Sequence, residues 1–239
     1  MKRIYLTSEK ILKKINLTLP EKYSLREYCP KPFDQGQEGS CTANALCHAY
    51  MLLCNINKNK DCNWIPSRSW VYFWEREEEQ PKFTLELKDS GAYVIDGEKF
   101  AYKTGICSDS LMPYNLNIFP SDEAIKDSCN HKIKNYKAID PSDIDKLISK
   151  NIPVLVALNI FDYFESDEVA SNGKVRLPLE TDKKLGGHEM LIIGYDKIKQ
   201  EYLILNSWGE NWGDKGFCYF PYSYIHNPSL SFAFSCIEL

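Results

Sequence analysis

The sequence predicts an α+β fold with two fused lobes and a cleft between them. Apolar residues repeat at helical spacing through much of the first half, whereas apolar runs of strand length follow one another in the second half. No linker divides the 239 residues, and 44% hydrophobic content suffices for one sizeable core. We expect a single unit over 1–239, with a helical lobe at 27–132 and a β-rich lobe at 133–239, on which residues 1–26 pack.

Helices are expected in four segments of the first half. Ser67 provides an N-cap signal for the third segment, and Gly105 provides a C-terminal signal for the fourth. The acidic run 75–79 is expected to form a solvated face of the third helix. The segments are 8–16, a helix beginning at Cys41, a helix opening at Pro66 that buries Trp70, Phe73 and Trp74, and 92–104.

Strands dominate the expected second half. A short helix is predicted at Asp140–Pro141, because proline is favoured at the first helical position. The polar segment 161–186 is expected to loop over the surface beside His188. Strands are predicted at 153–160, 188–195, 201–206, 216–220 and 231–237, with the second and third forming a hairpin.

Composition excludes several classes of function. A net charge of −4 gives no general attraction to nucleic acid or to an anionic membrane, and no apolar run reaches the roughly 18–20 residues that span a bilayer. The nine cysteines contain no Cys-x-x-Cys pair, which argues against a zinc site. We therefore expect a monomer without metal or cofactor, and without nucleic-acid or membrane partners.

A candidate nucleophile stands where a glycine-punctuated loop runs into Cys41. A thiol at a helix N-terminus faces unpaired backbone N–H groups and the positive end of the helix dipole, and both favour the thiolate. His188 lies 147 positions later, after two glycines, and Asn206 lies 18 positions further on. Cysteine, histidine and asparagine in this order can form a catalytic triad. His48, His131 and His226 lack such a context and are expected to be structural.

Four motifs in this order resemble the papain family of cysteine peptidases. They are Gln35 six residues before Cys41, the cysteine itself, His188 after its glycines, and the run 206–213, which reads Asn-Ser-Trp-Gly-Glu-Asn-Trp-Gly. The resemblance extends from about Leu19 to the end of the chain. It implies a papain-like fold, with a helical lobe, an antiparallel β-barrel-like lobe and the active-site cleft between them.

The resemblance also implies a role for each motif. Cys41 would be the thiolate nucleophile, and the His188 imidazolium would pair with it and then protonate the leaving amine. Asn206 would orient the imidazole, while Gln35 and the backbone N–H of Cys41 would bind the oxyanion. The expected substrate-binding residues are Gly91, Ala92, Gly187, Glu189 and Trp208, of which Trp208 would also shield the histidine–asparagine bond.

Two residues beside the catalytic positions depart from the family pattern. Thr42 follows the nucleophile where the family usually has tryptophan, and Glu189 follows the histidine where a small residue is common. A carboxylate in a partly desolvated pocket is costly unless it is paired. Either a substrate lysine or arginine, or an internal partner such as Arg26 or a tyrosine hydroxyl, would pair Glu189.

The cysteine pattern predicts a reducing compartment. Secreted papain relatives carry a disulfide that starts three residues before the nucleophile, where this chain has Glu38, and its usual partner aligns with Asp89. We expect an intracellular location, cytoplasmic or in a virion if the source is a virus. Other pairs, such as Cys107 with Cys129, stay open. About 20 residues before the domain are too few for the family's long inhibitory pro-segment. They are expected to form an ordered arm, with a short autoinhibitor as the less favoured alternative.

The function expected from these residues is that of a cysteine endopeptidase, which hydrolyses peptide bonds in peptides or proteins through a thioester acyl-enzyme. Three alternatives remain. An acyl transferase would use an amine instead of water to resolve the acyl-enzyme, and an inactive peptidase-like binding module or a purely structural protein would have an unreactive Cys41. Product analysis with added amines, and labelling of Cys41, distinguish these alternatives.

Overall fold

The computed structural model describes residues 19–57, 65–79 and 88–239, so the helix predicted at 8–16 lies outside the described residues. A seven-stranded antiparallel sheet runs in the order β2-β7-β3-β4-β5-β6, and β1 pairs with β4 beside this path. The strands are β1 (Lys22–Ser24), β2 (Asn135–Ala138), β3 (Val154–Phe161), β4 (Lys184–Asp196), β5 (Glu201–Leu205), β6 (Phe217–Pro221) and β7 (Ser231–Glu238).

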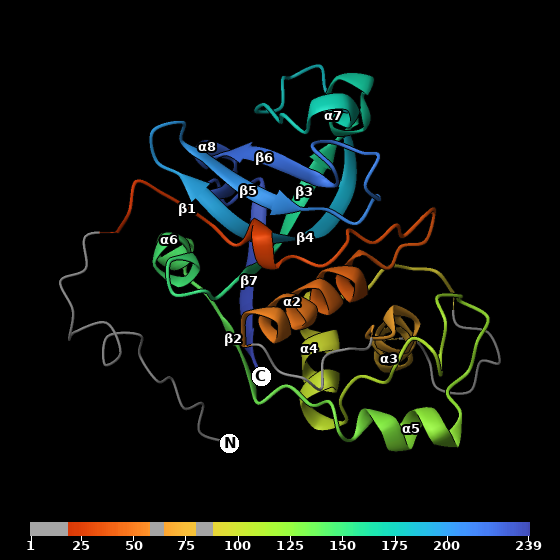
Figure 1. The fold of residues 1–239 in the computed structure, drawn as a ribbon. Helices are drawn as coiled ribbons and strands as arrows, with labels where there is room; N and C mark the ends of the chain where they lie inside the picture. The colour runs from red at the N-terminus through yellow and green to blue at the C-terminus, as the bar shows by residue number, and fades with distance from the viewer. Residues whose placement is uncertain (1–18, 58–64, 80–87) are drawn as a thin grey trace.

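The longer helices lie in the first half of the chain, as predicted. Figure 1 shows α2 between the sheet and the group formed by α3, α4 and α5. The α-helices are α2 (Cys41–Asn57), α3 (Arg68–Glu79), α4 (Val94–Lys103), α5 (Asp122–Ser128), α6 (Ile144–Ile148), α7 (Asp167–Asn172) and α8 (Tyr222–Ile225). Short 3₁₀ helices are η1 (Arg26–Tyr28), η3 (Pro141–Asp143) and η4 (Asp162–Glu165). The predicted α+β fold is confirmed, whereas the lobe boundaries stay a prediction.

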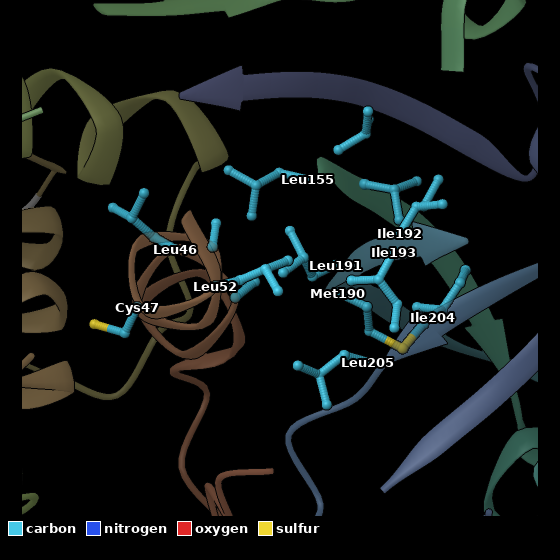
Figure 2. Close-up of a cluster of buried hydrophobic side chains, with 14 of the residues drawn as sticks. Leu46, Cys47, Leu52, Leu155, Met190, Leu191, Ile192, Ile193, Ile204 and Leu205 are labelled. Carbon is cyan, nitrogen blue, oxygen red and sulfur yellow. The ribbon is translucent and has the colours of Figure 1, made fainter. Parts of the chain in front are cut away.

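The core forms where α2 packs on the central strands. Leu46 and Leu52 of α2 lie beside Leu155 of β3 and Leu191 of β4, and all four side chains are almost fully buried (Figure 2). Burial of each such side chain is worth roughly 1.5–3 kcal/mol. This packing fixes the start of α2, and therefore Cys41, against strand β4.

Local signals explain several helix ends. The Ser67 hydroxyl accepts a hydrogen bond from the backbone N–H of Trp70 at 3.0 Å, as an N-cap should. Gly105 follows the end of α4 with φ of +98°, a value that favours glycine. Asp140 caps the turn that begins at Pro141, which starts as the 3₁₀ helix η3 and continues as α6.

Three predictions about local structure were wrong. The run 75–79 is not a solvated face throughout, because Glu75 and Arg76 are buried, while Trp74 is only half-buried. The segment 161–186 is not one surface loop, because it contains η4 and α7, and β4 already begins at Lys184. Apolar side chains within this segment, such as buried Phe164, hold it onto the core.

The cysteines of the described segments differ in state. Cys107 and Cys129 are free thiols, so the pair left open by the sequence does not form. Cys54 is disulfide-bonded, which weakens an assignment to a reducing compartment based on cysteine usage. The other free thiols are Cys29, Cys41, Cys47, Cys218 and Cys236. None of the helices described has the length and apolar character needed to cross a membrane.

Candidate active site

Cys41 is the first residue of α2 and lies against the strand that carries His188. Burial raises the pKa of its thiol to about 12, whereas hydrogen bonds from the backbone N–H groups of Glu189 and Thr42 lower it. Negative charge on Glu189 or Glu75 would raise the pKa further. The helix N-terminus thus favours the thiolate as predicted, but burial works against the low thiol pKa that the sequence led us to expect.

His188 and Asn206 meet directly. His188 is in β4 and 5% exposed, while Asn206 follows β5 and is fully buried. The Asn206 Oδ1 atom lies 2.8 Å from His188 Nε2 and also accepts the backbone N–H of Ser207 at 2.9 Å. Because the carbonyl oxygen only accepts, Nε2 must carry a proton and donate it. In the neutral imidazole, Nδ1 is therefore the basic nitrogen.

The same environment controls the charge of the imidazole. Burial lowers the pKa of His188 to about 4, and the hydrogen bond to Asn206 raises it. Aromatic rings cover the pair, with the Trp208 ring centroid 5.3 Å from that of His188 and the Phe164 centroid 6.2 Å away. Trp208 thus lies where the sequence predicted a shield. Phe164 was missed, because it falls in a segment interpreted as a polar loop.

Gln35 is held with its amide in one orientation. Its Oε1 atom accepts the Ser207 hydroxyl at 2.5 Å, and its Nε2 donates to the carbonyl oxygen of Glu38 at 2.8 Å. The backbone N–H of Gln35 donates to the carbonyl oxygen of Ser207 at 2.9 Å. These bonds leave one amide N–H for another acceptor and fix its direction. Ser207, whose role was missed, stands next to Asn206 within the predicted motif.

The five predicted substrate-binding residues have different surroundings. Gly91 adopts φ of +73° and donates its N–H to the Tyr72 hydroxyl at 3.1 Å, while Gly187 is exposed beside Phe232. Ala92 is half-buried, next to Gly91. A cavity of about 500 Å³ lies beside Trp208, the one member of the predicted set that lines it. Its walls also include Phe33, Asp34, Met51, Arg68 and Asp109.

Glu189 is more enclosed than expected of a residue that contacts substrate. It is only 3% exposed, on the opposite side of β4 from His188, and its Oε2 atom has no hydrogen-bond partner among the described residues. Arg26, the internal partner that the sequence suggested, instead pairs with Asp214 at 2.5 Å. Burial raises the pKa of Glu189 well above its ordinary value.

Comparison with known proteins identifies the chain. A family model described as "papain family cysteine protease" matches residues 19–227. The chain belongs to the papain family. It is 29% identical over 240 residues to an uncharacterized peptidase C1-like protein of Acanthamoeba polyphaga mimivirus, covering 95% of this chain and 73% of that protein.

Solved papain-family structures agree with this fold. The crystal structure of xylellain, a cysteine protease from Xylella fastidiosa, matches with a TM-score of 0.82 and 32% identity, covering 92% of this chain and 86% of xylellain. Procathepsin L 3 from the midgut of Tenebrio molitor larvae matches with a TM-score of 0.72 at 19% identity, covering 94% and 71% of the two chains, which supports the fold alone.

All four predicted catalytic residues of this papain-family chain lie within the matched range. The remaining histidines have other surroundings. His48 accepts the backbone N–H of Phe33 at 3.0 Å and stacks on the Phe33 ring, so it supports the chain just before Gln35. Across the three described ranges, no group of three or more His, Cys, Asp and Glu side chains could hold a metal ion.

Proposed function

We propose that the chain is a cysteine endopeptidase that hydrolyses peptide bonds through a thioester acyl-enzyme. The observation that carries the proposal is the bond from His188 Nε2 to the fixed Oδ1 of Asn206 at 2.8 Å. This bond makes Nδ1 the basic nitrogen of the His188 ring. The next residue, Glu189, hydrogen-bonds to the Cys41 thiol through its backbone N–H. Family membership supports the same chemistry.

In the acylation half, the Cys41 proton passes to His188 Nδ1 and the sulfur attacks the peptide carbonyl carbon, forming a C–S bond. The backbone N–H of Cys41 and the free amide N–H of Gln35 stabilise the oxyanion. As the intermediate collapses, the C–N bond breaks and Nδ1–H protonates the leaving amine. Asn206 keeps the proton on His188 Nε2 throughout, because the Asn206 Oδ1 atom can only accept a hydrogen bond.

In the deacylation half, Nδ1 takes a proton from water while the oxygen adds to the thioester carbonyl. The C–S bond then breaks, the carboxylic acid leaves and Cys41 regains its proton. An acyl transferase would differ only in this half, with an amine in place of water. Hydrolysis is favoured here because the family described for the matched range is one of proteases.

The test compares the parent with Cys41→Ala on a peptide library, with product sequencing and an added amine. We expect internal cleavage with free carboxylic acid products for the parent, and no cleavage for the variant. Amide products in place of acids would support the transferase. Absence of cleavage and of Cys41 labelling in a folded parent would support the binding module or structural protein.

The substrates we propose are peptides or proteins, bound by a monomer with contacts from Gly91, Ala92, Gly187 and Trp208. Glu189 would contribute to this surface mainly through its backbone. We also propose an intracellular location, cytoplasmic or in a virion. The seven free thiols among the described residues support it, and so does the viral relative, whereas the disulfide at Cys54 argues against it. Mass analysis of cysteine oxidation in the native host would decide.

A further inference from the structure

Three buried carboxyl groups share a region beside α2 and have no salt-bridge partner in the part of the chain that the structure describes. Glu75 of α3, Glu98 of α4 and Glu189 of β4 are 0%, 1% and 3% exposed. Each has one carboxyl oxygen without a hydrogen-bond partner among the described residues. An isolated buried carboxylate is so costly that such a group takes up a proton.

Glu75 is the member of this set that contacts the nucleophile's helix. The Thr42 hydroxyl donates to Glu75 Oε2 at 2.8 Å, and Thr42 directly follows Cys41. Behind the carboxyl group lies Gly97 of α4, where an added Cβ would clash with Glu75 Oε1. The carboxyl group is therefore enclosed between Thr42 and the α4 backbone, in a gap that only glycine leaves open.

The charged groups around Glu75 do not offset the cost of burying its anion. Burial raises the pKa of Glu75 well above its ordinary value and outweighs the Thr42 hydrogen bond, which lowers it, while Glu79 and Asp96 raise it further. Arg76 lowers it, but its guanidinium lies over the Tyr72 ring and its Nε donates to the Tyr72 carbonyl oxygen. Among the described residues, the titratable groups that face Glu75 are Cys41 of α2, Arg76 and Glu79 of α3, Asp96 of α4 and Glu189 of β4.

We propose that Glu75 is a positioning residue for the nucleophile and that it works as a protonated, uncharged acid. Through Thr42 it holds the first turn of α2, whose backbone N–H groups stabilise the Cys41 thiolate. Its neutral form matters because a negative charge next to the sulfur would disfavour the thiolate. The inference rests on the proposed function only in taking Cys41 as the nucleophile.

The test is the rate of Cys41 alkylation by iodoacetamide between pH 4 and 12, a range that reaches the thiol pKa of about 12, with peptide mapping to separate Cys41 from the other thiols. Alkylation follows the thiolate and needs no substrate, so the test stands even if the chain cleaves no peptide. Glu75→Gln keeps an acceptor for Thr42 and cannot ionise. Glu75→Ala and Thr42→Val each remove the bond. Glu98→Ala removes an equally buried carboxyl group that bonds to Ser235 of β7 instead.

We expect the apparent thiol pKa to rise by about half a unit or more in Glu75→Ala and in Thr42→Val. The double variant should show the same rise, because the two residues act through one bond. Glu75→Gln should keep the parent profile, and Glu98→Ala should leave it unchanged. If Glu75→Ala fails to fold, the thiol pKa of Thr42→Val is compared with that of Glu98→Ala instead.

Three results would overturn the proposal. An unchanged profile in Thr42→Val would show that the bond does not position the nucleophile. An equal shift in Glu98→Ala would show a general effect of burial. A fall of a unit or more in the thiol pKa of Glu75→Gln would show that Glu75 is charged in the parent.

Discussion

Replacing Glu98 by glutamine should remove a large part of the pH dependence of stability. Glu98 belongs to α4, and its Oε1 accepts the hydroxyl of Ser235 in β7, so the bond joins the helical part to the sheet. Burial raises the pKa of Glu98 from 4.5 to about 7, while the Ser235 bond lowers it. Glutamine has nearly the same shape and can accept the same bond, but it cannot ionise.

The size of the effect follows from proton linkage. One unit of pKa difference between folded and unfolded chains is worth about 1.36 kcal/mol, so a move from 4.5 to about 7 is worth about 3 kcal/mol. The unfolded chain releases this proton first as the pH rises. The contribution of Glu98 to the free energy of unfolding is therefore fully present below pH 4.5, decreases between pH 4.5 and about 7, and is lost above about pH 7.

The assay is urea unfolding of the parent and Glu98→Gln at half-unit steps from pH 4 to 8. The free energy of unfolding of Glu98→Gln minus that of the parent should increase by about 3 kcal/mol from the low to the high end of this range. Titratable groups common to both proteins cancel in this difference. The matched control Lys103→Gln changes an exposed residue of the same helix and should give a pH-independent difference over the same range. A flat difference for Glu98→Gln would refute a buried, protonated Glu98.

Three further substitutions test the site and the core. Asn206→Ala should lower kcat but leave measurable turnover, because the imidazole loses its orientation and not its proton; equal kcat in both would contradict this role. Gln35→Ala should cost on the order of 100- to 1000-fold in kcat with little change in KM, and a change in KM alone would argue against an oxyanion role. Leu52→Ala, at a fully buried position on α2, should lower the free energy of unfolding by about 2–5 kcal/mol, measured in urea; a loss below about 1 kcal/mol would mean that the α2–sheet contact is not central.

The candidate catalytic residues could be proposed from the sequence because each belongs to a local motif. Cys41 follows a glycine-punctuated loop at a helix start, and His188 and Asn206 stand at the ends of apolar strand patterns. Strand alternation also predicts that Glu189 lies on the opposite face of its strand from His188. Such patterns indicate the order of groups along an element and the face on which each group lies.

The burial of the acidic residue Glu75 beside the candidate active site could not be predicted in the same way. Glu75 opens an acidic run that by composition is typical of a solvated helix face. Its burial depends on Gly97, 22 positions later, which leaves room for the carboxyl group on α4, and on Thr42, which supplies a donor. Partners so far apart in the sequence produce no periodic pattern from which their contact could be predicted. The short strands β1 and β2 escaped prediction for a related reason, because their partners β4 and β7 define them.

The bonds that assemble the site also join the parts of the fold. Ser207 links the end of β5 to Gln35 in the loop before α2, Thr42 links α2 to α3, and Ser235 links β7 to α4. Because Cys41 and His188 come from different elements, their relative position depends on how α2 lies against β4. A variant that loosens one of these links should therefore affect chemistry only if the link reaches α2 or the Gln35 loop. The Ser235–Glu98 link does neither, which is why Glu98→Gln should change stability with pH while turnover at neutral pH stays unchanged.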